Sequence, residues 1–227
     1  MAQTLPLPLP LAEAGPLPSP LASPLEATRL YYQDRFARAG DTPQGVDWRD
    51  ETAQDLRLSR LVGHLDLRGA SLLDVGCGTG ALLRLLARER AGCAAYAGID
   101  LVPAMVAAAR ARHPEQPDAT FRCLALEALP PGETHDFVVA SGIFNVQAGI
   151  GAAEWAAHVE ATLDAMWRRA RRGIAFNMLS GHADQPRPGL HHAAPGALVD
   201  RLAARLSHRF VLDQGYGLFD FTLSLFR

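Results

Sequence analysis

The sequence carries little net charge, few cysteines and no cluster of metal-binding residues. Its 227 residues sum to a formal charge of −2, and so weak a field does not gather nucleic acid by itself. The three cysteines, Cys77, Cys93 and Cys123, are odd in number, and their spacing fits no zinc motif. We therefore expect free thiols in a reducing cytoplasm and no metal site.

The N-terminal segment has no apolar run that is free of proline. Residues 1–26 read MAQTLPLPLPLAEAGPLPSPLASPLE, and proline recurs too often there for a membrane-spanning helix. A secretory signal has a basic region before its apolar stretch, and no such region is present here. We expect residues 1–24 to form a polyproline-like arm, disordered or lying on the surface. A Pro-rich docking ligand is the alternative, although alternating Leu and Pro more often marks a spacer.

Along the rest of the chain, short apolar runs alternate with longer segments whose apolar residues recur at helical spacing. Buried strands are predicted in SLLDV, AAYAGID, ATFRCLAL, HDFVVASG and RGIAFNMLS. Strands that alternate with helices indicate right-handed crossovers and a mainly parallel sheet. Residues 209–227 hold two β-rich runs without room for a helix, which predicts an antiparallel hairpin at one edge. The predicted helices span about 25–40, 50–62, 79–90, 102–113, 152–170 and 196–206.

The stretch LLDVGCGTGALL, residues 72–83, packs three glycines into five positions between two apolar runs. After a strand the loop turns sharply, and a helix begins near Thr79. Unpaired N–H groups at a helix start attract the anionic part of a ligand, and glycine lets a ligand touch the main chain. As Gly76-x-Gly78-x-x-Ala81 the loop also meets a dinucleotide fingerprint loosely, so a nicotinamide enzyme stays an alternative.

Two acids favour a different ligand. Asp74 precedes the glycines within the strand, where it can face an ammonium group, and the third glycine, Gly80, makes the pattern G-x-G-x-G. Asp100 ends the next strand, and its two acceptor oxygens suit both hydroxyls of a ribose. Leu101 is then placed to lie against a base. Together these residues describe a ligand with an amino-acid end and a nucleoside end, and we expect no second domain that would hold a hydride acceptor.

This combination resembles the class I S-adenosylmethionine-dependent methyltransferases. LLDVGCGTG, AGID, FRCLALEALP and HDFVVASGIFNV follow in that order at the usual spacing, and the resemblance runs from about residue 56 to the C-terminus. It implies an α/β, Rossmann-like fold with a seven-stranded, mainly parallel sheet whose last strand is antiparallel. It also implies S-adenosyl-L-methionine as cofactor. We expect one domain over 25–227, with a helical lid at 25–65 and the Rossmann-like core at 66–227.

The resemblance also implies roles for single residues. Asp74 orients the amino group of the cofactor, directly or through water, and Asp100 holds the ribose hydroxyls. Where the family commonly has an acid for the adenine amine, this chain has Ala125, so that contact is lost or made by the backbone of 124–126 or by Glu127. The expected cofactor residues are Asp74, Gly76, Gly78, Gly80, Asp100, Leu101, Leu124, Ala125, Ser141, Tyr32 and Arg57.

Two of these residues lie in the N-terminal helices, and each has an alternative interpretation without a role in cofactor binding. Tyr32, with Tyr31, reaches the cofactor carboxylate or the substrate, or it is an ordinary packed aromatic. Arg57 pairs with the methionine carboxylate as a fork, or it is a surface arginine. Trp48, in GVDW, is on a loop that can close over the sulfur.

Candidate catalytic residues follow the fourth and fifth strands. A sulfonium loses its charge as a nucleophile attacks, so neutral groups suit its surroundings better than strong anions. Asn145 orients a nucleophile or caps a loop. Asn177, inside an apolar strand, is either a structural tie or a pocket group. His182 and the pair at 191–192 offer bases, or are merely solvated.

The stretches GVDW, SGIFNV and AFNMLS resemble a narrower group of bacterial methyltransferase-like proteins with few settled substrates. Some relatives act in specialised-metabolite or surface-glycan pathways. Certain related enzymes cyclise the aminobutyryl chain of the cofactor to azetidine-2-carboxylate and release methylthioadenosine. We predict in-line methylation of a small molecule or carrier-bound metabolite. A cofactor cyclase and a non-catalytic, cofactor-binding regulatory module are the alternatives.

The run WRRARRGIAF invites a nucleic-acid interpretation, which its surroundings disfavour. The arginines stand at the C-terminal end of a predicted helix, where cations complement the helix dipole. No N/D-P-P-Y/F stretch follows the fourth strand, which argues against methylation of nucleic-acid bases. We therefore expect a monomer or homodimer with no nucleic-acid or membrane partner.

Overall fold

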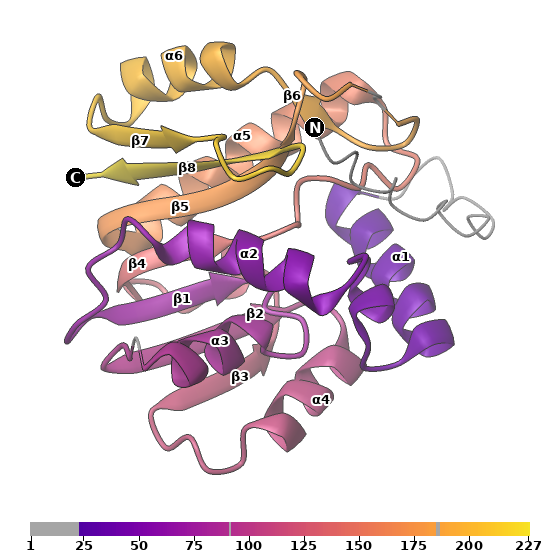
Figure 1. The fold of residues 1–227 in the computed structure, drawn as a ribbon, viewed down its shortest axis with the longest axis vertical. Helices are drawn as coiled ribbons and strands as arrows, with labels where there is room; N and C mark the ends of the chain where they lie inside the picture. Colours follow the sequence, from indigo (N-terminus) through magenta and orange to yellow (C-terminus); the bar gives the residue numbers. More distant parts are fainter. Residues whose placement is uncertain (1–22, 91, 185–186) are drawn as a thin grey trace, which may run out of the picture.

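The protein is built around one mostly parallel sheet (Figure 1). The structure is a computed structural model that describes residues 23–90, 92–184 and 187–227. The strands run in the order β3-β2-β1-β4-β5-β8-β7, and β6 pairs with β5 beside this path. β8 is antiparallel to both β5 and β7, and the other pairings between these strands are parallel. The strands are β1 (Ser71–Val75), β2 (Ala95–Asp100), β3 (Ala119–Cys123), β4 (His135–Ala140), β5 (Ala170–Ser180), β6 (His192–Ala193), β7 (Phe210–Asp213) and β8 (Asp220–Phe226).

Helices cover both faces of the sheet. One face packs against α2 (Glu51–Val62), α3 (Ala81–Glu89) and α4 (Pro103–Arg112). The other face packs against α5 (Ala152–Arg169) and α6 (Pro195–Arg205). Because both faces are buried, the central strands are continuous apolar runs, which is why the sequence marks them clearly. Among the described residues, no helix is both long enough and apolar enough to cross a membrane.

The N-terminal helix lies where β1, β2 and β4 end (Figure 1). It is α1 (Pro24–Ala39), and the 3₁₀ helix η1 (Pro43–Val46) follows it. The hydroxyl of Ser23 accepts the N–H of Glu26, and Pro24 suits a first helical turn, so the helix begins at the residue that was expected to end the arm. The rest of the predicted arm, residues 1–22, lies outside the described residues.

The predicted architecture is confirmed, with local differences. The C-terminal hairpin forms from β7 and β8, and seven strands make up the path of the sheet. The additional strand β6 has two residues, too few to show any periodicity in the sequence. The strand expected in ATFRCLAL ends at Cys123, and the 3₁₀ helix η2 (Leu126–Ala128) begins at the last residue of that stretch. Within the segment predicted as the lid, α2 buries Leu58 and Leu61 against the sheet.

Candidate active site

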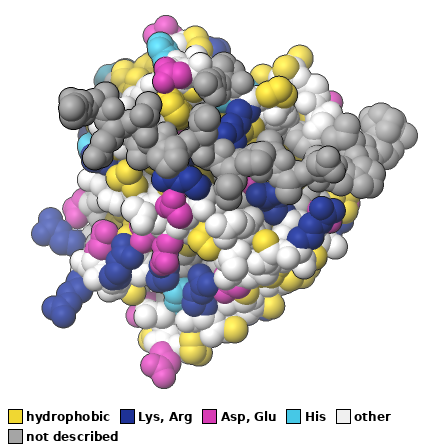
Figure 2. Space-filling model, turned by 45° about the vertical axis from the view of Figure 1, so that its right-hand side comes forward, with side chains coloured by type: hydrophobic (Ala, Val, Ile, Leu, Met, Phe, Trp, Pro, Cys, Tyr) yellow, Lys and Arg dark blue, Asp and Glu magenta, His cyan; other side chains and the backbone are white. Residues whose placement is uncertain are grey.

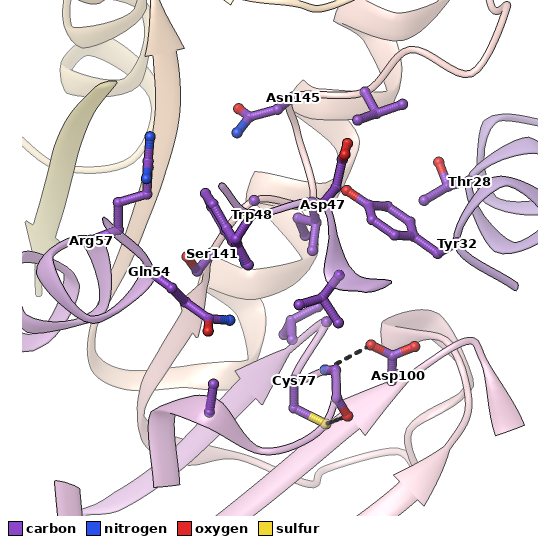
Figure 3. A pocket seen from close by; sticks show the side chains of 18 of the residues that line it. Thr28, Tyr32, Asp47, Trp48, Gln54, Arg57, Cys77, Asp100, Ser141 and Asn145 are labelled. Carbon is purple, nitrogen blue, oxygen red and sulfur yellow. Dashed lines mark hydrogen bonds between the residues drawn. The ribbon is translucent and has the colours of Figure 1, made fainter. Parts of the chain in front are cut away.

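A cavity of about 810 Å³ opens at the carboxyl ends of the central strands, beside α1 and η1 (Figure 3). It brings together most of the residues that the sequence predicted for the site. Gly80, Asn177 and His182 are not among the residues that line it. The predicted residues that do line it are Tyr32, Arg57, Asp74, Gly76, Gly78, Asp100, Leu101, Leu124, Ala125, Ser141 and Asn145.

The glycine loop owes its composition largely to neighbouring protein atoms. Gly76 has a φ of 73°, and a Cβ there would lie 2.2 Å from Cγ2 of Ile143. At Gly80, with a φ of 81°, a Cβ would lie 2.8 Å from Nε2 of His113. Both positions therefore need glycine before any ligand is considered.

The N–H groups of this loop are mostly used within the protein, contrary to expectation. Those of Gly76 and Cys77 both donate to the carbonyl of Ile99, at 2.8 and 3.0 Å. The N–H of Gly78 donates to Oδ2 of Asp100 at 2.9 Å, as drawn in Figure 3. The loop thus serves the site by fixing the Asp100 carboxylate more than by offering free donors to an anion.

Asp100 is held as an acceptor at the cavity wall. Its Oδ1 accepts the N–H of Val102 at 2.9 Å, and the residue is 9% exposed. Burial raises the pKa of this carboxyl, and the hydrogen bonds from Val102 and Gly78 oppose that rise. Each carboxylate oxygen accepts one N–H and keeps a lone pair for a further donor.

Asp74 lines the same cavity in a less polar setting. Its Oδ2 accepts the hydroxyl of Tyr96 at 2.6 Å, and the residue is 3% exposed. Burial raises the pKa of this carboxyl to about 7, the Tyr96 hydrogen bond lowers it, and the charge of Asp100 raises it. A cationic group placed in the cavity would stabilise the ionised form.

The end of β4 is fixed by an amide from the neighbouring strand. Oδ1 of Asn177 accepts the N–H of Gly142 at 3.1 Å, and its Nδ2 donates to Oγ of Ser141 at 3.1 Å. Asn177 is fully buried and is absent from the cavity wall. Of the two alternatives predicted for Asn177, this placement matches the structural one. Its side chain holds Ser141 and Gly142 in position.

Asn145 does line the cavity, and one side of its amide is already engaged. Its Oδ1 accepts the N–H of Leu179 at 3.1 Å. A backbone donor requires the oxygen at that position, so the Nδ2 group is the part left to face other partners (Figure 3). Asn145 therefore offers hydrogen-bond donors.

Of the candidate bases His182, His191 and His192, the cavity is lined by His192. His182 is exposed beyond β5, and its backbone N–H donates to Oγ of Ser180. His192, in β6, is half-buried and lines the cavity. Pairing of β6 with the end of β5 places His192 there, and no local pattern in the sequence indicates that pairing.

Arg57 has a protein partner where a cofactor carboxylate was expected. Its Nε and Nη2 donate to Oδ2 of Asp220 at 3.0 and 2.7 Å, and its Nη1 donates to the carbonyl of Ala53. The guanidinium also lies 4.7 Å from the ring centroid of Trp48. Asp220 lies in β8, and sequence reasoning missed it because nothing local to it indicates the pairing.

The GVDW stretch closes the cavity from the N-terminal side. Asp47, in a left-handed conformation with a φ of 65°, accepts the hydroxyl of Tyr31 at 3.0 Å and pairs with Arg35 at 2.6 Å. This anchors the segment to α1 and places the next residue, Trp48, against Gly142. Sequence reasoning selected Trp48 and missed Asp47, although both lie in the same motif. It also missed Gln54, which lines the cavity (Figure 3).

The arginines of WRRARRGIAF serve the protein itself. Arg169 donates to the carbonyls of Leu129 and Pro130, and Arg171 pairs with Asp136. On the face shown in Figure 2, arginine and acidic side chains are interspersed rather than gathered by sign. Among the described residues, no group of His, Cys, Asp or Glu is arranged to hold a metal ion.

Comparisons with known proteins agree with this geometry. The profile of a methyltransferase domain matches residues 72–173. Rv1506c of Mycobacterium tuberculosis, a protein named as a methyltransferase, is 42% identical over 155 residues, which cover 67% of this chain and 90% of that protein. A ubiquinone biosynthesis O-methyltransferase of Neisseria meningitidis is 36% identical over 112 residues, or 47% of this chain and 46% of that protein.

The solved structures that resemble this fold include several methyltransferases. Magnesium protoporphyrin IX methyltransferase of Synechocystis PCC 6803, solved with bound SAH, gives a TM-score of 0.60 at 19% identity, over 88% of this chain and 97% of that chain. The fold and the site thus define a class I methyltransferase. This chain belongs to the S-adenosylmethionine-dependent methyltransferase family, whose defining cofactor is S-adenosyl-L-methionine.

Proposed function

We propose that this chain methylates a small molecule or a carrier-bound metabolite, and that the accepting atom is an oxygen. The main support is the single cavity of about 810 Å³ that extends from Asp74 and Asp100 to Asn145. Small-molecule sites usually measure about 300–1,000 Å³, and this one is near the upper end. Such a volume suits a cofactor together with a compact acceptor or the end of a carrier arm.

The groups on one side of the cavity fit the cofactor. Asp74 is an acid without a cationic partner among the described residues, which suits an ammonium group. Asp100 keeps acceptor capacity for ribose hydroxyls, and Leu101 and Leu124 offer apolar surface for a base. Glu127 lines the same side and is a candidate for the adenine amine, because Ala125 has no side-chain acceptor.

The opposite side of the cavity carries the support for an oxygen acceptor. Bound S-adenosylmethionine supplies an electrophilic methyl group on a positively charged sulfur. Asn145 turns its Nδ2 donors toward that region, since Leu179 occupies its oxygen. Donors hold an atom with lone pairs, such as a carbonyl, carboxylate or hydroxyl oxygen, whereas a protonated amine would meet them with its own N–H groups.

The names of two matched relatives point the same way. One is the ubiquinone biosynthesis O-methyltransferase of Neisseria meningitidis, and another is a malonyl-[acyl-carrier protein] O-methyltransferase of Acetivibrio thermocellus, 38% identical over 87 residues. These names describe transfer to oxygen, one of them on a carrier protein. Each relative aligns with less than half of this chain, so they support the proposal without fixing the substrate.

The test is an acceptor panel in which each phenol or carboxylic acid is matched by the corresponding amine. We expect S-adenosylhomocysteine and a methylated oxygen product, both identified by mass spectrometry. Methylthioadenosine formed without any acceptor, preferential methylation of the amines, or cofactor binding without turnover over the whole panel would contradict the proposal.

A single substitution examines the part played by Asn145. Asn145→Asp keeps an oxygen for the N–H of Leu179 and replaces the two donors with an acceptor. We expect it to lower kcat/KM for the oxygen acceptor at least about tenfold, because the hydrogen bond that holds the acceptor oxygen is lost and a carboxylate replaces the donors. Gln116→Glu makes the same chemical change on an exposed residue away from the cavity and serves as the control.

A further inference from the structure

Tyr96 lies directly behind the acid that faces the cavity. It is in β2, where it pairs in register with Leu72 of β1, two residues before Asp74. Its ring packs against Phe121 in the core, with 5.7 Å between ring centroids, and the residue is 3% exposed. Its hydroxyl donates to Oδ2 of Asp74 at 2.6 Å. Asp74 lines the cavity and Tyr96 does not.

We propose that Tyr96 is a positioning residue of the cofactor site, whose hydroxyl holds Oδ2 of Asp74 so that Oδ1 meets the ammonium group. This inference rests on the proposed function, in which Asp74 receives that group. The other surroundings of Tyr96 are apolar, so phenylalanine would satisfy the packing. The hydroxyl has one hydrogen-bond partner in the structure, and that partner is the acid of the site.

Three titratable groups lie near Asp74. Tyr96 from β2 donates to it, Asp100 at the end of β2 repels it, and the buried thiol of Cys77 lies in the loop that follows β1. Burial and Asp100 raise the pKa of Asp74, while the Tyr96 hydrogen bond lowers it. Tyr96 is therefore the neighbour that favours the ionised form, the form that an ammonium group requires.

The experiment measures binding of S-adenosylhomocysteine by calorimetry between about pH 5.5 and pH 8.5. In the unmodified protein we expect affinity to rise with pH through about 7, the pKa of Asp74, with release of a proton on binding. Tyr96→Phe should move this midpoint upward by about one unit, which lowers the ionised fraction of Asp74 and weakens binding about fivefold at pH 7. Titration of the ligand itself is common to all variants and cancels in the comparison.

A matched control separates positioning from packing. Tyr216 is also a buried tyrosine, and its hydroxyl makes one hydrogen bond, with Oγ1 of Thr222 at 3.2 Å; neither of these two residues lines the cavity. Tyr216→Phe should lower the melting temperature without moving the pH midpoint of binding. A Tyr96→Phe profile that coincides with that of the unmodified protein would overturn the inference, because Tyr96 would then act only in packing.

Two further measurements keep the inference apart from the proposed function. Carbon NMR of the Asp74 carboxyl in the ligand-free protein should show a higher pKa in Tyr96→Phe, and an unchanged pKa would overturn the inference whatever the cofactor does. Asp74→Asn should lose the pH dependence of binding and most of the affinity. If Asp74→Asn binds S-adenosylhomocysteine as tightly as the unmodified protein does, the proposed role of Asp74 fails instead.

Discussion

The two acids of the site have the same side chain and different surroundings. Asp100 accepts two backbone N–H groups, which stabilise its negative charge although it is buried. Asp74 accepts one tyrosine hydroxyl, and its pKa of about 7 leaves it divided between two protonation states near neutral pH. Asp100 is thus prepared to accept hydrogen bonds from neutral hydroxyls, whereas Asp74 gains most from a cation.

The hydrogen bonds of Asp100 lead to the first prediction. Asp100→Asn replaces one acceptor oxygen with an NH₂ group, which faces the N–H of Gly78 or of Val102 and cannot accept a ribose hydroxyl. We expect affinity for S-adenosylhomocysteine to fall by about 1–3 kcal/mol, measured by calorimetry. Asp118→Asn, at an exposed acid just before β3, should leave the affinity unchanged. Equal affinities in the two variants would contradict the ribose role of Asp100.

Burial of Asp74 leads to a prediction about stability. Its folded pKa of about 7 lies above the ordinary value of 3.8, so the folded state holds the proton more tightly. The resulting stability is fully present below about pH 4 and is lost as pH rises through about 7. Asp74→Asn has no such proton. At pH 8 the ligand-free variant should therefore exceed the unmodified protein in unfolding free energy by an amount on the order of 1–4 kcal/mol, measured with urea. A variant that is equally stable at pH 5 and less stable at pH 8 would show that burial does not strain this carboxylate.

The site residues that lie within sequence motifs could be predicted, whereas the residues that they pair or hydrogen-bond with could not. The spacing of Asp74 and Asp100 about the glycines predicts both acids near adjacent strand ends, and both line the cavity. The partner of Arg57 is 163 residues away in sequence, and the partner of Asp74 depends on the register of two strands. Such pairings need the tertiary structure, because no local pattern encodes them.

At the scale of elements, the lid is a set of short segments that one side chain fastens together. Asp47 binds Tyr31 and Arg35 of α1, and it ends η1 in a left-handed conformation. Trp48 follows at once and packs on the backbone of Gly142, at the end of β4. Closure of the cavity therefore depends on the close approach of an indole ring to a glycine.

That approach predicts a specific intolerance at Gly142. A Cβ there would lie 2.8 Å from Cζ2 of Trp48, and the φ of 80° is itself unfavourable for alanine. Gly132 has the same φ with nothing within 4 Å, so Gly132→Ala carries the backbone strain without the clash. Gly142→Ala should lower the unfolding free energy by about 1–3 kcal/mol more than Gly132→Ala does. It should also weaken binding of S-adenosylhomocysteine, as calorimetry would measure. If the two variants are alike, Trp48 does not rest on this glycine in solution.

Elements were predictable where burial on both faces makes a run apolar, and less so elsewhere. The runs that became β1, β2 and β4 are of this kind, and their order identified the fold. The two-residue β6 and the four-residue η1 carry no periodicity, so their positions depend on contacts made after the sheet has formed. His192, one of the predicted candidate bases, reaches the cavity wall through β6, whose pairing with β5 no local pattern indicates.

At the scale of the whole molecule, the N-terminal helix α2 contacts the C-terminal hairpin, which forms one edge of the sheet. Figure 1 shows α2 and β8 near one another, although they stand at opposite ends of the described chain. Arg57 of α2 and Asp220 of β8 form the polar link between them, and the Asp220 side chain is fully buried. The same arginine stacks on Trp48, so the link extends from the hairpin to the lid.

This link predicts strong coupling between the two ends of the chain. Removing one member of a buried ion pair leaves the other charge without a partner, which costs about 3–5 kcal/mol. Arg57→Met and Asp220→Leu should each lower the unfolding free energy by that amount, measured with urea. The double variant should lose less than the sum of the two, because apolar side chains then replace both charges.

An exposed pair within one helix provides the comparison. Arg38 and Asp34 of α1 lie 3.0 Å apart, with their side chains 56% and 53% exposed. Substituting alanine for either should change stability by less than about 1 kcal/mol. If Arg57→Met and Asp220→Leu are as mild as these, or if their effects simply add, the hairpin and the lid are not coupled through this pair. Strong coupling, by contrast, would mean that the Trp48 closure of the cavity depends on an acid in the last strand of the chain.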